Sequence, residues 1–485
     1  MTVKQFCCSR RFWAQATKLA LPIAFQNLLV SSFVLIDTLM VSRLGGDALP
    51  AVGMAGQWQW LLNICLFGTC SGMSVFIAQY WGKKDIAGIH RVYGTGLVTA
   101  LALLLLFFVP ALISPQLVLR FFTTEAPVIE LGASYLGILV WCFPAVTLTN
   151  VFSIVLRSTE DVRLPMWASA VTTLVNVVLD YGLIFGELGL PAMGVEGAAL
   201  ATVIAAWCGP AIILLVSLVR RNILIAPIAA VFSCPKGWIA EFFRRAMAVM
   251  FNESAWGLGT VLYNVIFGHL GAEHFAALTV LRTVENLAFV FFVGFGNAAC
   301  VMIGKEVGAG DIKEAVHDAR RFSLLVPVLG VLIGAVVILL REPLIALFNV
   351  ENATLNMDTA MAIMLIYALQ LPVRNIPYIQ IVGIFRSGGD TATGAKYDLL
   401  SLYGIALPLT FLGAFVFKLP FAVCFALMYL GEDYLKMILC LRHFFSLRWL
   451  KPVTEEGKLG LTNYRAQLEQ TRAAAKNRKK VEETP

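Results

Sequence analysis

The sequence predicts an all-α membrane protein in which twelve transmembrane helices form two six-helix lobes. Three observations lead to this fold class. Of the 485 residues, 59% are hydrophobic and only 14% are charged, whereas a soluble domain carries about 25% charged residues. Apolar stretches long enough to cross a bilayer recur from end to end. Motifs of the first half also return in the second half.

The elements follow from the lengths of the apolar stretches. A hydrocarbon core about 30 Å thick needs about 20 apolar residues in helical form. Twelve stretches satisfy this requirement, with short loops between them and a polar tail behind the last. They cover residues 15–42, 52–78, 93–113, 130–156, 165–187, 196–219, 240–267, 279–303, 320–341, 357–385, 395–416 and 420–446.

The distribution of positive charge predicts the orientation, because cytoplasmic loops are enriched in Lys and Arg. Loops on the side of the two termini carry 30 of the 37 Lys and Arg residues, and loops on the opposite side carry five. We therefore expect an integral protein of the plasma (inner) membrane with both termini in the cytoplasm. The basic residues then face the lipid bilayer, and we expect no nucleic-acid partner.

The two halves repeat each other at a nearly constant spacing. The motif "RLGGDALPAVG" in the first half corresponds to "HLGAEHFAAL" in the second at an offset of 226 residues, and Gly82 corresponds to Gly308 at the same offset. Arg157 corresponds to Arg386 at an offset of 229. Six spans per half give both halves the same orientation, so the repeat implies a pseudo-twofold axis along the membrane normal and a site between two lobes.

This repeat also divides the chain. We expect a cytoplasmic arm, an N-lobe of spans one to six, a cytoplasmic linker, a C-lobe of spans seven to twelve and a polar cytoplasmic tail. Their predicted ranges are 1–14, 15–219, 220–239, 240–446 and 447–485.

Several function classes lack their signatures. The sequence contains no Walker loop, nucleophile elbow or zinc motif. We therefore expect neither an enzyme nor an ATP-driven pump, with no catalytic residue and no cofactor.

Three motifs make the chain resemble a known family. The segments "VLRSTEDVRLPM", "NVVLDYGLIFGELGLPAMGVEGAALAT" and "GIFRSGGDT" follow one another on the repeated six-span frame. They are similar to the multidrug and toxic compound extrusion (MATE) family, and the resemblance covers about residues 10–445. It implies a V-shaped, two-lobe antiporter that exports organic, often cationic, compounds against an inward flow of Na⁺ or H⁺.

Ionisable residues inside a span are functional candidates because their burial is costly. The N-lobe contains Asp37 in span one and Asp180 in span five, with Asn176 one helical turn before Asp180 on the same helix face. For each acid the alternative is a plain hydrogen bond between helices. The resemblance implies a coupling site for Na⁺ or H⁺ at these three residues, which would ligate Na⁺ in a Na⁺-coupled protein. It adds Tyr135 as a hydrogen-bonding support. Thr202 is a weaker candidate.

The C-lobe differs from this pattern. Position 409, which corresponds to Asp180, is a leucine. The resemblance matches Glu253 to a span-seven glutamate that one branch of the family uses, but Asn375 occupies the place of that branch's span-ten aspartate. Arg374 lies next to it inside the span. Glu253 and Arg374 therefore form either a charge pair or two separate sites, and Glu253 is a possible second cation site.

Two other function classes compete with an antiporter. A flippase for lipid-linked precursors on a related two-lobe scaffold would need a strongly cationic cavity, whereas the buried N-lobe charges are acidic. A membrane receptor or assembly subunit without transport would need no isolated carboxylates such as Asp37. The favoured partners are small organic substrates and the bilayer, and we expect a monomer.

Overall fold

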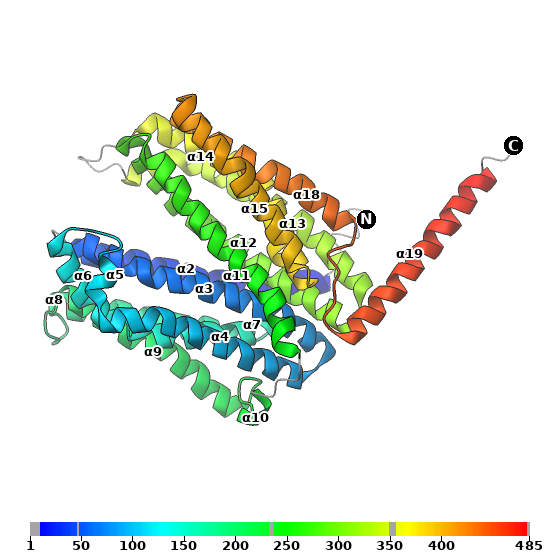
Figure 1. Cartoon of the computed structure of the whole chain (residues 1–485), viewed down its shortest axis with the longest axis horizontal. Helices are drawn as coiled ribbons and strands as arrows, with labels where there is room; N and C mark the ends of the chain where they lie inside the picture. The colour runs from blue at the N-terminus through cyan, green and yellow to red at the C-terminus, as the bar shows by residue number, and fades with distance from the viewer. Residues whose placement is uncertain (1–9, 46–47, 232–236, 349–355, 483–485) are drawn as a thin grey trace.

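The computed structural model describes residues 10–45, 48–231, 237–348 and 356–482. Residues 1–9 of the predicted arm therefore lie outside the described part. The chain folds as two helical lobes with a long final helix that extends away from them (Figure 1). The helices of the first half are α2 (Arg10–Ser42), α3 (Ala48–Lys83), α4 (Ile86–Ile113), α5 (Pro115–Leu119), α6 (Ala126–Leu139), α7 (Cys142–Ser158), α8 (Arg163–Phe185), α9 (Val195–Arg220) and α10 (Ile228–Val231).

The second half begins with three long helices and continues with helices that contain π-helical segments. They are α11 (Trp238–Gly268), α12 (Ala272–Ala309), α13 (Ile312–Phe348), α14 (Met357–Tyr378), η1 (Ile379–Phe385), α15 (Thr391–Ser401), η2 (Leu402–Ala406), α16 (Leu407–Phe411), η3 (Leu412–Val416), α17 (Phe421–Tyr429), η4 (Leu430–Tyr434), α18 (Leu435–Phe445) and α19 (Glu455–Glu482).

Twelve membrane spans can be assigned to the described residues. Nine continuous helical segments are long and apolar enough to cross a membrane, and the bent pair α6–α7 supplies a tenth. Helix α11 and the composite span α17–η4–α18 complete the set, and both carry charged residues along their length. The predicted twelve-span, two-lobe fold class is therefore confirmed.

The fourth span departs from the sequence prediction of one continuous helix over 130–156. Its two halves, α6 and α7, meet at an angle of 50°. Pro144 accounts for the break, because it has no N–H to donate to the carbonyl of Val140 four residues earlier. The turn instead closes with shorter bonds from Trp141 N–H to Ile138 O and from Phe143 N–H to Val140 O.

Each half of the molecule has its own hydrophobic core, and one helix of each half crosses to the other. The first part of α2 is buried in the C-lobe core through Phe12, Ala16 and Ala20. The first part of α11 is buried in the N-lobe core through Phe242 and Ala246. Ala16 and Ala20 lie 226 residues before Phe242 and Ala246, so the exchange of helices obeys the sequence repeat.

The pseudo-twofold axis is visible in contacts between equivalent residues. Ser74 Oγ lies 3.8 Å from Cys300 Sγ, and these residues are separated by 226 positions. A Cβ atom on Gly82 would lie 1.9 Å from Lys305 O, and one on Gly308 would lie 1.9 Å from Gln79 O. Lobe contact at this end of the molecule therefore requires glycine at both equivalent positions, as close helix packing in membranes often does. We call it the contact end.

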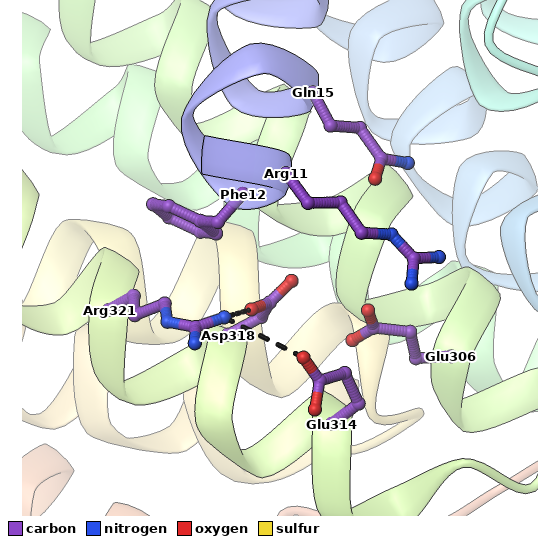
Figure 2. Close-up of a pocket in the computed structure, with 7 residues that line it drawn as sticks. All are labelled: Arg11, Phe12, Gln15, Glu306, Glu314, Asp318 and Arg321. Carbon is purple, nitrogen blue, oxygen red and sulfur yellow. Dashed lines mark hydrogen bonds and ion pairs between the residues drawn. The ribbon is translucent and has the colours of Figure 1, made fainter. Parts of the chain in front are cut away.

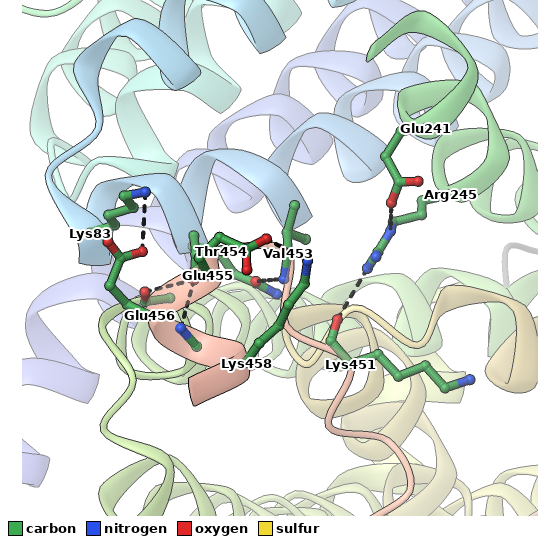
Figure 3. Close-up of polar contacts among 12 residues, drawn as sticks. Lys83, Glu241, Arg245, Lys451, Val453, Thr454, Glu455, Glu456 and Lys458 are labelled. Atoms are coloured by element: carbon green, nitrogen blue, oxygen red, sulfur yellow. Dashed lines mark hydrogen bonds and ion pairs between the residues drawn. The ribbon is translucent and has the colours of Figure 1, made fainter. Parts of the chain in front are cut away.

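A segment behind α18 ties the lobes together at the contact end (Figure 3). Val453 N–H donates to Gln79 Oε1 of α3 at 2.7 Å, and Thr454 Oγ1 donates to Gly308 O of α12 at 2.8 Å. Lys83 Nζ pairs with Glu456 Oε2 of α19 at 3.1 Å. One continuous segment thus contacts both lobes, and α19 begins there before it extends outward (Figure 1).

Candidate functional site

The N-lobe candidates come from four helices. Asp37 lies on α2, Tyr135 on α6, Asn176 and Asp180 on α8, and Thr202 on α9. Asn176 and Asp180 share one face of α8 because they are one turn apart. Asn176 Nδ2 lies 3.5 Å from Thr202 Oγ1, which itself donates to the Ala198 carbonyl at 2.9 Å.

The same residues form one electrostatic group. The carboxylates of Asp37 and Asp180 interact with each other, and both interact with the Tyr135 side chain. Tyr135 is 4% exposed and Asp180 is fully buried. The structure therefore brings together the acids, the amide and the tyrosine that the sequence singled out.

Several oxygens in this group have no hydrogen-bond partner among the described residues. They are both carboxylate oxygens of Asp180, the Asn176 amide oxygen and Asp37 Oδ1. Buried polar atoms in proteins nearly always have a partner, and an orphan is costly. Within the described structure, the alternative of plain helix–helix hydrogen bonds therefore fails at Asp180.

The donor set fits a hard monovalent cation or a proton. Na⁺ would find carboxylate, amide and hydroxyl oxygens here, and two interacting carboxylates favour the uptake of a proton. Among the described residues, no group of three or more His, Cys, Asp or Glu side chains is placed to hold a metal ion. An ion bound by Asp37, Asn176 and Asp180 would therefore depend on amide and hydroxyl oxygens, or on water, for its remaining contacts.

The two C-lobe candidates do not pair with each other. Glu253 Oε1 accepts a hydrogen bond from Arg386, whose other nitrogen donates to Ser71 Oγ of the N-lobe at 2.7 Å. Arg374 donates to Glu285 Oε1 at 2.7 Å and to the Tyr429 hydroxyl at 2.9 Å. The expected Glu253–Arg374 pair is therefore wrong, because each charge has a nearer partner, and separate placement is correct.

The sequence reasoning missed a larger charged cluster in the C-lobe. Lys436 Nζ lies 3.0 Å from Asp398 Oδ1, 3.1 Å from Glu432 Oε1 and 3.7 Å from Asp433 Oδ1. The run "GEDYLK" in the last span, with three charged residues in five positions, was the available signal. An isolated Glu432–Lys436 bridge accounts for only one of its contacts.

A second polar site lies at the contact end (Figure 2). It is a pocket lined by Arg11 and Gln15 of α2, Glu306 of α12, and Asp318 and Arg321 of α13, among others. Arg321 donates to Asp318 at 2.6 Å. Since two of its basic side chains face its acids, this pocket serves foremost as a polar joint between α2 and the C-lobe.

A loop carboxylate completes this joint. Glu160, between α7 and α8, accepts hydrogen bonds from Lys305, Trp81 and Gln15. Burial acts to raise the pKa of Glu160, but Lys305 and the other donors outweigh burial and hold this pKa below its usual value. Glu160 is therefore an anion that binds α2, α3 and α12 together.

We expect Glu253→Gln to lower stability. The change leaves Arg386, whose side chain is 4% exposed, without a counter-charge, and breaking a buried ion pair costs roughly 3–5 kcal/mol. Thermal unfolding of the purified protein should shift clearly downward, whereas Glu187→Gln at an exposed loop position should not move it. A stable Glu253→Gln protein that no longer transports would instead make Glu253 a cation or substrate site. A stable and fully active one would contradict both roles.

Comparison with known proteins places these features in a family. The MatE family model matches residues 22–182 and 247–412, which are the two repeats. A probable multidrug resistance protein NorM of Thermotoga maritima is 25% identical over 444 residues, covering 90% of this chain and 92% of the relative. The multidrug resistance protein NorM of Burkholderia vietnamiensis is 27% identical over 405 residues, covering 82% and 86%.

The fold has solved counterparts. The crystal structure of the eukaryotic MATE transporter AtDTX14 superposes with a TM-score of 0.80 at 18% identity, covering 93% of this chain and 98% of that one. The two repeats, the two-lobe fold and the matching family model together lead to one conclusion: this chain belongs to the MatE family of multidrug efflux transporters.

Proposed function

We propose that this protein is a secondary active antiporter that exports organic, mainly cationic, compounds in exchange for inward Na⁺ or H⁺. The observation that carries the proposal is the N-lobe group of Asp37, Asn176 and Asp180, whose buried oxygens have no hydrogen-bond partner in the described structure. A buried anionic group of this kind needs a counter-ion. It would take one from either the ion gradient or the exported compound.

Competition for this group would produce exchange. A bound Na⁺ or H⁺ neutralises Asp37 and Asp180 and removes their attraction for an organic cation. A bound cation in turn keeps the ion out. A ligand shifts a conformational equilibrium only by its difference in affinity for the two states. Ion and compound would therefore drive the lobes in opposite directions.

The proposed orientation follows from the positive loops. The contact end carries both chain termini and the basic loops, so we place it at the cytoplasm and the opposite end outside the plasma (inner) membrane. The described conformation is then closed toward the cytoplasm. We further propose that one monomer suffices, since both lobes come from one chain.

A lipid-precursor flippase is the weaker alternative. A pyrophosphate group needs positive charge, and the N-lobe group offers only Asp37 and Asp180 as charges. The same two acids also give the antiporter its task for an ion gradient.

We expect Asp37→Asn to abolish gradient-driven export while the protein stays folded. Asparagine keeps the size of the side chain but cannot bind a proton or carry the charge that attracts a cation. Uptake of a fluorescent organic cation into proteoliposomes under an imposed Na⁺ or pH gradient checks this, with elution on size-exclusion chromatography as the test of folding. Full gradient-driven uptake by Asp37→Asn would refute the proposed function.

A further inference from the structure

The C-lobe contains a pocket that the N-lobe ion site does not account for. Residues from six helical segments line it, and they are all on the C-lobe side of the molecule. It encloses about 310 Å³, including its part open to solvent, which is at the lower end of the range for small-molecule sites, roughly 300–1,000 Å³. Its lining includes Trp256, Leu402 and Met428 as the apolar part.

One wall of this pocket has an excess of positive charge. Arg282 Nη1 donates to Glu285 Oε2 at 3.1 Å, and Arg374 Nη1 donates to Glu285 Oε1 at 2.7 Å. Two guanidinium groups therefore share one carboxylate. Both side chains also line the pocket and remain partly open, at 30% and 23% exposure. This wall can bind one more anionic group, for which a planar guanidinium is well suited.

The opposite charge gathers around Glu432, which also lines the pocket. Glu432, Asp433 and Asp398 all lie within 4 Å of the single ammonium of Lys436. Three carboxylates therefore share one cation. Asp433 is 1% exposed and neither of its carboxylate oxygens has a hydrogen-bond partner among the described residues. This wall can bind a cationic group.

A third feature points to a ligand in the pocket. Tyr263 lines it and is 4% exposed, yet its hydroxyl has no hydrogen-bond partner in the part of the chain that the structure describes. Leu402 and Glu432 lie in the π-helical segments η2 and η4, and π-helical turns inside α-helices are frequent at functional sites.

From this arrangement we propose that the C-lobe pocket binds an aromatic zwitterion. Its carboxylate lies against Arg282 and Arg374, its protonated amine lies against Glu432, and its ring system packs on Trp256 and Met428. The proposal rests on the proposed export function and names a substrate class for it. It differs from the N-lobe group, which offers no positive side chain among the described residues and so accepts only cations.

Equilibrium binding to the full chain in lipid nanodiscs tests this proposal without any ion gradient. The probes are an aromatic carboxylic acid that carries a protonated amine, its ethyl ester, which is only cationic, and its N-acetyl derivative, which is only anionic. Titration calorimetry should give the highest affinity for the zwitterion. Each analogue should bind about tenfold more weakly, because it loses one charged contact.

Two substitutions should separate the walls. Arg374→Gln should weaken binding of the zwitterion and the N-acetyl probe but not of the ester. Glu432→Gln should weaken binding of the zwitterion and the ester but not of the N-acetyl probe. If both variants affect all three probes alike, or affect none, the proposal is wrong.

A third variant keeps the test valid should either charge variant fail to fold. Tyr263→Phe removes only an unpartnered hydroxyl, so it should leave thermal stability unchanged or higher while it weakens binding of the zwitterion. Tyr181→Phe on an exposed face of the N-lobe is its matched control and should change neither. Unaltered zwitterion binding by Tyr263→Phe would contradict the proposed pocket. Absent gradient-driven transport with intact zwitterion binding would instead contradict the antiporter function alone.

Discussion

Asp180→Asn should reduce ion-driven export to the level of empty liposomes. Asp180 is fully buried and both of its carboxylate oxygens lack a hydrogen-bond partner in the described structure, so its charge contributes nothing that a neighbouring donor would stabilise. Asparagine removes that charge at nearly constant volume. The variant should therefore fold at least as stably as the wild type, because an unpaired buried charge is destabilising. Only the response of transport to Na⁺ and pH should disappear.

The repeat provides the matched control for this experiment. Leu409 occupies the equivalent C-lobe position, so Leu409→Ala perturbs the corresponding helix without touching any charge. It should keep the dependence of transport on the ion gradient. Ion-driven transport that survives in Asp180→Asn but fails in Glu253→Gln would move the coupling site to the C-lobe.

A cysteine at position 74 should allow the lobes to be locked. Ser74 Oγ lies 3.8 Å from Cys300 Sγ across the pseudo-twofold axis, and two thiols there need only a small shift to reach the bond length of about 2.0 Å of a disulfide. Oxidation of Ser74→Cys with copper phenanthroline should join α3 to α12 at the contact end. Transport should then stop, since alternating access requires this end to open, and a reducing agent should restore it.

The lock has its own controls. Ser74→Cys combined with Cys300→Ala cannot form the bond and should transport under oxidation as well as it does under reduction, as should the oxidised wild type. Mass spectrometry of the linked peptides confirms that the bond has formed. Wild-type transport rates in fully cross-linked protein would mean that the lobes do not separate at this end.

The sequence was sufficient to predict the spans, the repeat and the N-lobe group. Apolar length identifies a membrane helix because the bilayer thickness is fixed. The offset of 226 residues already contained the reciprocal contacts of Gly82 and Gly308. Asp180 stood out because an acid inside an apolar span is costly to bury and is rarely retained there without a function.

The C-lobe partners could not be predicted in the same way. Charges there occur in several neighbouring spans, and which charges pair depends on helix rotation and depth. Arg374 had Glu253 as its most visible partner in the sequence, yet the structure pairs it with Glu285 of α12. Sequence spacing orders residues along one helix, but it does not place faces of different helices against each other. The π-helical turns add to this, because they rotate the residues that follow them.

Exchange of an organic compound for an ion is tested most directly by uptake into proteoliposomes of the wild-type protein. A fluorescent organic cation is offered outside while a Na⁺ gradient, a pH gradient or no gradient is imposed. The account predicts that one of the two gradients drives uptake above the level without a gradient, and that reversing this gradient drives efflux of preloaded compound. Uptake that is the same under all three conditions and in both directions would contradict it.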